Sequence, residues 1–281
     1  MPKIQRGQPI HRSDIRQTKA LGQVFLNTDW PVKKIVEQVK SLGIQAVIEI
    51  GPGNGILTFA LADAGISVTA IEKDNRFAER LHHLTSNDTK TNIEVINTDV
   101  LEFDLGSWIE KMKKSGTKIA VLGNIPYNIS TPIIMWMLPH LGLLTAGIFM
   151  VQLEFAQRIV SSPDSKSYGS LSVFCQLRSI CEFNFEVGKS CFTPIPKVDS
   201  AVITMKPRSA PVASNKLLQY TETVCRIAFT LRRKKLRNGV KPFMAKLKEE
   251  DSPIDLNRRA ETLSPGEFVD LAAFLFSDKL S

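Results

Sequence analysis

The chain has 281 residues, of which 43% are hydrophobic and 23% are charged, and its formal net charge is +8. This composition is typical of a globular protein, and no apolar run reaches the roughly 18 residues that a membrane-spanning helix needs. The N-terminal segment lacks the apolar core of a signal peptide, and the four cysteines include no Cys-x-x-Cys pair. We therefore expect a cytoplasmic protein with reduced thiols, with no membrane segment and no metal site.

The positive charge is concentrated at the two ends of the chain. Residues 1–20 carry five Lys or Arg against one acid and are predicted to form a flexible basic arm. Residues 206–248 carry twelve Lys or Arg against one acid. Such clustering is typical of a polyanion-binding surface, whereas short runs also occur on solvated helix faces. We predict nucleic-acid binding by Arg232, Arg233, Lys234, Lys235 and Arg237.

The first half of the chain reads as alternating helices and strands. A helix is predicted over 29–42, capped by Thr28 or Asp29, and a buried strand over 46–50. A glycine-rich turn over 51–55, a helix reaching Gly65 and a strand over 67–72 follow. This order of elements is typical of a nucleotide-binding unit: a strand, a glycine turn, a helix and a second strand that ends on an acid about 20 residues past the first glycine. Glu72 is that acid and is placed to meet ribose hydroxyls.

The end of the first strand favours one nucleotide over others. Glu49 precedes Gly51-Pro-Gly-Asn-Gly55, and an acid at this place opposes a pyrophosphate but suits an amine. This pattern points to S-adenosylmethionine, which carries an ammonium, a sulfonium and no phosphate. The alternative is that Glu49 only hydrogen-bonds to other residues of the protein.

Two further strand ends carry candidate site residues. A helix over 74–84 and a strand over 92–98 lead to Asp99, which could accept from an adenine amine or cap the next turn. The apolar run 118–122 leads into Gly123-Asn124-Ile125-Pro126-Tyr127, in which proline fixes the turn. An amide beside a carbonyl and a flat ring suits the exocyclic amine of a planar base. An ordinary turn with a buried tyrosine is the alternative. Strand ends of an open α/β sheet share one edge, where ligands bind.

The second half continues this alternation and then becomes helical. A helix over 131–138, a strand over 145–152 and a helix over 154–161 precede two strands, 182–187 and 198–205, predicted to pair antiparallel. The proline-stiffened loop 191–197 between them presents Phe192. A polar linker over 207–214 is followed by predicted helices at 215–231, 240–248, 256–262 and 265–276.

Several motifs resemble those of one enzyme family. They are Leu21-Gly-Gln-Val-Phe-Leu26, Glu49-Ile-Gly-Pro-Gly53, Glu72, Asp99, Gly123-Asn-Ile-Pro-Tyr-Asn-Ile-Ser130, Gln152-Leu-Glu154 with Arg158, Phe192-Thr-Pro-Ile-Pro-Lys-Val-Asp-Ser200, and the basic segment 226–238. With these motifs in this order, the chain resembles the adenine N6-dimethyltransferases of small-subunit ribosomal RNA. The erythromycin-resistance RNA methyltransferases are a closely related family. The resemblance implies a Rossmann-like α/β methyltransferase domain over 21–206 and a small all-α RNA-binding domain over 207–281.

The resemblance also implies roles for individual residues. Those implied to bind S-adenosylmethionine are Val24, Leu26, Gly51, Glu72, Asp99 and Asn124. Those implied to hold the target adenine are Asn124, Ile125, Pro126, Tyr127 and Phe192, with the two rings stacking on the base. Val24 departs from the family, which has asparagine there, so that only a backbone contact can remain at this position.

The implied function is dimethylation of the N6 amines of two adjacent adenines near the 3′ end of 16S ribosomal RNA, with a role in small-subunit biogenesis. The expected partner is the small ribosomal subunit, and the expected state is a monomer. The alternatives are methylation of large-subunit RNA or of DNA adenine, and an assembly or nucleic-acid-binding factor in which methylation is secondary.

Overall fold

The computed structural model describes residues 24–86, 92–113, 116–244 and 247–280. The predicted basic arm, residues 1–20, lies outside the described residues. The described chain forms two compact units, one of which contains the residues up to Trp136 together with Ile148–Met150 and Val187–Asp199. The predicted functional boundary between residues 206 and 207 stays a prediction.

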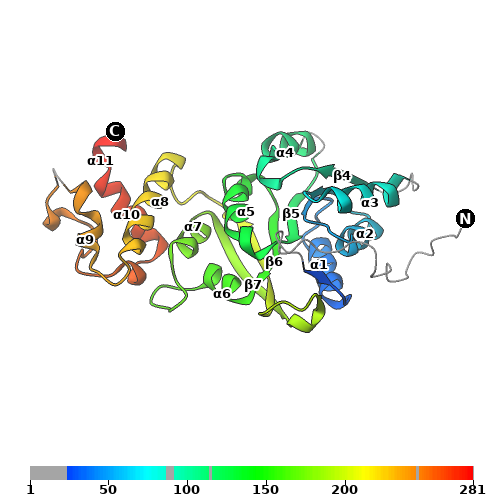
Figure 1. Ribbon diagram of the computed structural model, residues 1–281. Coiled ribbons are helices and arrows are strands. Elements are labelled where there is room, and N and C mark those ends of the chain that lie inside the picture. The colour runs from blue at the N-terminus through cyan, green and yellow to red at the C-terminus, as the bar shows by residue number, and fades with distance from the viewer. Residues whose placement is uncertain (1–23, 87–91, 114–115, 245–246, 281) are drawn as a thin grey trace, which may run out of the picture. The chain divides into compact units, whose positions relative to one another are not determined.

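The first unit contains alternating strands and helices, as the sequence predicts (Figure 1). Its elements are β1 (Phe25–Leu26), α1 (Trp30–Ser41), β2 (Ala46–Ile50), α2 (Ile56–Asp63), β3 (Ser67–Glu72), α3 (Asn75–Ser86), β4 (Ile93–Asn97), α4 (Leu105–Lys113), β5 (Ile119–Asn124) and the start of α5 (Ser130–Met137). The N-cap residue of α1 is Asp29, but no side chain caps this helix, so that part of the prediction is wrong.

The main sheet is parallel where the nucleotide-binding unit was predicted. Strand β2 pairs in parallel with both β3 and β5, and β3 pairs in parallel with β4. All five residues of β2 are buried, because a parallel strand is covered on both faces. The full strand order is β4-β3-β2-β5-β6-β9-β7, with β6 at Ala146–Gln152, β7 at Ser179–Val187 and β9 at Ser200–Pro207. The fold is therefore the expected Rossmann-like α/β class.

The second unit holds most of the later elements. Its helices are α6 (Leu153–Val160), α7 (Ser170–Arg178), α8 (Asn215–Thr230), α9 (Leu236–Val240), α10 (Pro265–Leu275) and α11 (Ser277–Leu280). Helix α8 packs along α10, and the Tyr220 ring stacks on Phe276 at 4.3 Å between centroids. The predicted helices at 215–231 and 265–276 are thereby confirmed.

The predicted helix over 256–262 is wrong, because this segment contains only a 3₁₀ turn at Ala260–Thr262. Of the predicted helix over 240–248, the described residues show the end of α9 at Val240 and a 3₁₀ turn at Lys241–Phe243, while residues 245–246 lie outside the described residues. The reason for the difference at 256–262 is a long-range backbone pairing. Leu236 N donates to Arg258 O at 2.9 Å, and Lys235 forms an antiparallel bridge with Arg259. This pairing uses backbone groups that a helix would keep for itself.

Among the described residues, no helix is long and apolar enough to cross a membrane.

Candidate active site

A cavity of about 290 Å³ lies in the first unit, at the carboxyl ends of the parallel strands. This volume is close to the lower end of the range for small-molecule sites, about 300–1,000 Å³. The predicted residues that line it come from β1, the glycine turn and three strand ends: Val24, Leu26, Gly51, Glu72, Asp99, Asn124, Ile125 and Pro126. The structure therefore brings together all six predicted cofactor residues and three of the five predicted target residues.

The glycine turn over 51–55 leaves room for a ligand at the end of β2. Gly51 has φ +64°, a backbone angle that residues with a side chain rarely adopt, and a Cβ placed on it would meet nothing within 4 Å. Gly53 has φ +53°, and a Cβ there would lie 2.6 Å from the Phe25 ring. Glycine at these two positions therefore lets β1 close over the turn while the floor at Gly51 stays accessible to a ligand.

Glu72 is held at the end of β3 by two backbone donors. Gly53 N donates to Oε2 at 3.1 Å and Asp74 N donates to Oε1 at 2.9 Å. Burial raises the pKa of Glu72, while these two bonds lower it in part. Each oxygen keeps a second lone pair, so the carboxylate can also accept from hydroxyls in the cavity.

Glu49 is the most buried acid of the cavity. Its side chain is 2% exposed, and among the described residues Oε2 has no hydrogen-bond partner. Burial raises its pKa to about 8; the Thr58 hydroxyl lowers the pKa in part, and the charge of Glu72 raises it. A buried carboxyl of this kind is suited to meet a cationic group of a ligand.

Asp99 has a partner that the sequence pattern did not indicate. Lys73 Nζ donates to Oδ2 at 2.6 Å, and Leu101 N donates to Oδ1 at 3.0 Å. The Lys73 bond holds the pKa of Asp99 below its usual value. Asp99 thus lines the cavity and also caps the turn that follows it, so the two readings left open by the sequence coexist. Lys73 directly follows Glu72 at the same strand end, but nothing in the sequence pairs it with Asp99.

Asn124 closes the cavity beside β1. Its Nδ2 donates to the backbone carbonyl of Val24 at 3.0 Å, whereas its buried Oδ1 has no partner among the described residues. Ile125 N donates to Met150 O at 3.2 Å, which holds the turn against β6. Val24 makes this contact to Asn124 through its backbone, and the expected backbone contact of Val24 to the cofactor stays a prediction. The bond to Val24 uses Nδ2 of Asn124, so that Oδ1 is the amide atom left to accept a hydrogen bond.

The two predicted stacking rings do not line this cavity. Tyr127 is half-buried and belongs to a 3₁₀ turn over Tyr127–Ile129. Phe192 is fully buried in β8 (Phe192–Thr193), which pairs antiparallel with β1 and brings Phe192 opposite Leu26. In this conformation Phe192 is buried beside β1 and has no surface free to stack on a base. A loop that presents an aromatic residue in sequence can bury it once a strand forms.

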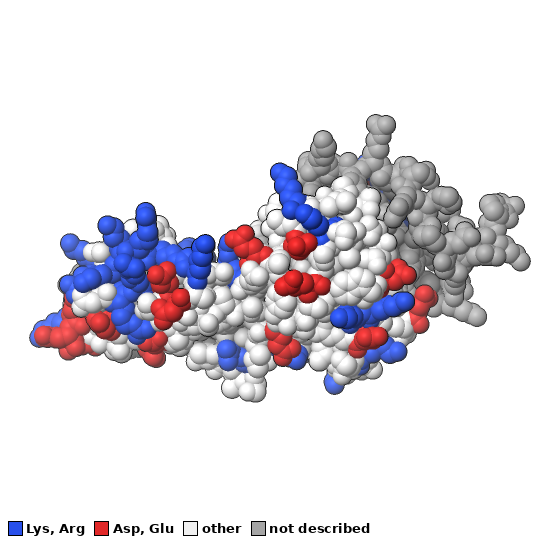
Figure 2. Space-filling model, turned by 90° about the horizontal axis from the view of Figure 1, so that it is seen from below, with Lys and Arg blue, Asp and Glu red and all other residues white. Residues whose placement is uncertain are grey.

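The predicted RNA-binding residues lie on the helical part of the second unit, where Lys and Arg gather among scattered acids (Figure 2). Arg233 and Lys234 are exposed, and among the described residues neither side chain has a partner. Arg232 pairs with Glu261 at 2.7 Å. Lys235 and Arg237 both donate to Asn257 Oδ1, at 3.1 and 2.7 Å.

Within the described residues, no group of three or more His, Cys, Asp or Glu could hold a metal ion.

Comparison with known proteins agrees with this geometry. Residues 15–276 match the model of the ribosomal RNA adenine dimethylase family. A protein of Francisella tularensis subsp. novicida, the ribosomal RNA small subunit methyltransferase A, is 39% identical over 263 residues, which cover 92% of this chain and 97% of the relative.

Two solved structures are also similar. The 23S rRNA methyltransferase ErmE is 28% identical with a TM-score of 0.62, covering 89% of this chain and 99% of that one. A dimethyladenosine transferase from Plasmodium falciparum has a TM-score of 0.72 at 23% identity, covering 91% and 98%, and supports the fold.

Proposed function

The chain belongs to the ribosomal RNA adenine dimethylase family, and we propose that it dimethylates the N6 amines of two adjacent adenines near the 3′ end of 16S ribosomal RNA. The observation that carries the proposal is the Asn124 amide. The residue lines the cavity, its amide nitrogen donates to the Val24 carbonyl, and its buried Oδ1 has no partner among the described residues.

The cavity fits S-adenosylmethionine as the methyl donor. The open floor at Gly51 suits a close approach by the ligand, and the unpartnered Oε2 of Glu49 suits a cationic ammonium. Glu72 would accept from the ribose hydroxyls, and Asp99 from the adenine amine of the cofactor. When bound, S-adenosylmethionine supplies an electrophilic methyl group on a sulfonium.

The protein contributes orientation and fixed dipoles to the reaction. The N6 amine of adenine is a poor nucleophile because its lone pair is delocalised into the ring. The Asn124 Oδ1 and the Ile125 carbonyl would accept its two protons and favour a pyramidal nitrogen directed at the methyl group. No strong base is needed, since the proton can leave after transfer, and the rate gain comes from placement. The target base must leave its stack to reach this turn.

RNA binding is assigned to residues 207–281, and methyl transfer to residues 21–206. The exposed cations Arg233 and Lys234 support the first assignment, because exposed unpaired cations can neutralise phosphates. We infer a monomer that works in the cytoplasm on the small ribosomal subunit. A role in subunit assembly is compatible with the same surface.

The test is to map methyl incorporation from labelled cofactor. Under-methylated small subunits, large subunits and DNA are offered separately, and the modified nucleosides are identified. The proposal expects N6-dimethyladenine at two adjacent positions of the small-subunit RNA. Methylation confined to large-subunit RNA, the substrate class of the 23S rRNA methyltransferase ErmE, would overturn the proposal.

A further inference from the structure

A second cavity, of about 570 Å³, lies entirely within the second unit. Its walls come from α6, the loop that leads into α7, and the end of α8. Three cationic side chains line it, one from each wall: Arg158, Lys166 and Arg232. No residue of this cavity lines the first one.

Two of these cations can turn toward a ligand. Lys166 is exposed, and among the described residues its ammonium has no partner. Arg158 meets Glu154 at 3.4 Å, with the two side chains 46% and 81% exposed. An ion pair so open to water contributes little, so the guanidinium can exchange Glu154 for a ligand.

The third cation fixes the shape of the cavity. Arg232 Nε donates to Glu261 at 2.7 Å, and its Nη2 donates to the Lys166 carbonyl at 2.9 Å. These bonds tie the end of α8 to the loop that carries Lys166. Arg232 is thus both a wall of the cavity and the first residue of the basic segment 232–237, so the cavity is continuous with that segment.

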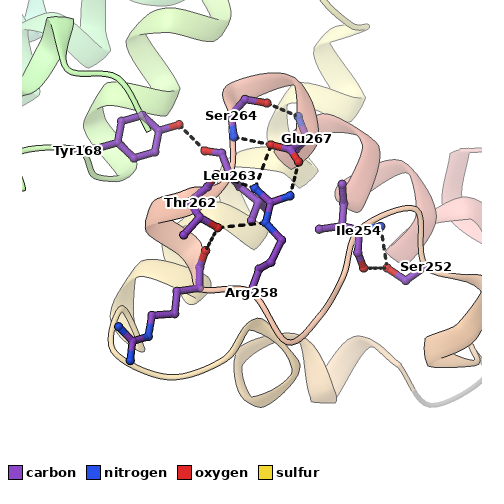
Figure 3. Close-up of polar contacts among 9 residues, drawn as sticks. Tyr168, Ser252, Ile254, Arg258, Thr262, Leu263, Ser264 and Glu267 are labelled. Carbon is purple, nitrogen blue, oxygen red and sulfur yellow. Dashed lines mark hydrogen bonds and ion pairs between the residues drawn. The ribbon is translucent and has the colours of Figure 1, made fainter. Parts of the chain in front are cut away.

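The floor of the cavity is also held in place. Tyr168 is fully buried, and its hydroxyl donates to the Leu263 carbonyl at 2.8 Å (Figure 3). The next residue along, Ser264, exchanges two hydrogen bonds with Glu267 in a capping box, and Arg258 joins Glu267 to the Thr262 carbonyl. This network holds the segment on which Tyr168 rests, so the site exists before any ligand arrives.

A helix start adds to the positive potential. Helix α7 begins at Ser170, which lines the cavity together with Leu171. The Ser172 hydroxyl accepts from the N–H of Gly169, whereas among the described residues no side chain accepts from the N–H groups of Ser170 and Leu171. The free N–H groups and the dipole of a helix N-terminus favour an anion. Two exposed cations, a fixed arginine and a helix start therefore converge on one volume.

We propose that this cavity binds a phosphate group of the RNA backbone, through Arg158, Lys166 and the start of α7. The inference rests on the proposed function, because RNA is the polyanion which that function requires. Continuity with the basic segment favours RNA over a free phosphate, since one strand can contact both. Arg158 and Lys166 would thus be RNA-positioning residues that the run 232–237 alone does not reveal.

The test compares Arg158→Gln, Lys166→Gln and the double variant with the parental chain. Binding to under-methylated small subunits is measured without methyl transfer, over a range of salt concentrations. Loss of one phosphate contact should weaken binding and lower the slope of log affinity against log salt by about 0.9, or about 0.7 for a single strand. Lys33→Gln removes the same charge from an exposed position of α1, outside both cavities and outside the residues assigned to RNA binding, and serves as the matched control.

Two outcomes would overturn the proposal. One is a double variant with the parental affinity and salt slope. The other is stabilisation by inorganic phosphate in the parental chain but not in the double variant, with RNA binding unchanged, which would assign the site to a free phosphate. The affinity of each variant for S-adenosylhomocysteine should equal that of the parental chain, which shows that the variants are folded. Methyl mapping with the parental chain tests the proposed function separately.

Discussion

Replacing Glu49 with glutamine should abolish a proton release that accompanies cofactor binding. Burial raises the pKa of Glu49 to about 8, so at pH 7 about nine-tenths of the empty protein carries this carboxyl protonated. An ammonium bound beside it favours the carboxylate, and the proton then leaves. Cofactor affinity should therefore increase as the pH increases, by up to about tenfold per pH unit until pH 8, and should stay constant at higher pH.

The same shift predicts the sign of a stability change. The unfolded chain ionises Glu49 near pH 4.5, whereas the folded chain resists ionisation up to about pH 8. Folding is therefore increasingly opposed as pH rises from 4.5 toward 8, which amounts to about 3 kcal/mol at pH 7 by the usual 1.4 kcal/mol per unit. The cofactor-free Glu49→Gln variant lacks this cost and should unfold at higher denaturant concentration than the parental chain at pH 7, with the difference shrinking toward pH 4.5.

Calorimetry in buffers of different ionisation enthalpy measures the proton release directly. S-adenosylhomocysteine is the ligand, and Glu37→Gln, at an exposed position of α1, is the matched control. We expect close to one proton released at pH 7 by the parental chain and by the control, and much less by Glu49→Gln. Equal release by all three proteins would show that Glu49 does not meet the ammonium.

Three other substitutions test separate parts of the structure. Gly123→Ala places a Cβ 2.4 Å from the Ile50 carbonyl oxygen and should cost about 1–3 kcal/mol in urea unfolding; an unchanged midpoint would contradict the close strand packing. Lys73→Gln removes the donor that lowers the pKa of Asp99, so NMR titration should show that pKa rising, and an unshifted titration would mean that the ion pair does not form in solution. Ser264→Ala removes the N-cap acceptor of α10 and should lower stability by about 1 kcal/mol in the same unfolding assay; no loss would argue against the capping box.

The parallel part of the fold was predictable because its signals are local. Strands β2 and β3 have the predicted bounds, since each is a short apolar run that stops at a glycine or an acid. The convergence of Glu72, Asp99 and Asn124 also followed from sequence, because parallel strands deliver their carboxyl ends to one edge. Helix α7 was not predicted, since it is buried on most sides and shows no amphipathic stripe.

What the sequence could not supply were contacts between distant segments. The pairing of β1 with β8 buries Phe192, and the bond between Asn124 and Val24 spans a hundred residues. The pairing of Lys235 with Arg259 replaced a predicted helix. Each depends on backbone groups, which carry no residue-specific pattern. The sequence also did not indicate that the Val24 carbonyl accepts from Asn124 and thereby orients its amide.

The central claim is that the Asn124 amide, oriented by the Val24 carbonyl, positions the target adenine for methyl transfer. The most direct measurement is the methyl-transfer rate of Asn124→Ala on under-methylated small subunits, taken together with its affinity for S-adenosylhomocysteine. The account predicts that transfer falls by at least about a hundredfold, as when a placed dipole is lost from an active site, while the cofactor still binds. Transfer at the parental rate with normal cofactor binding would contradict it.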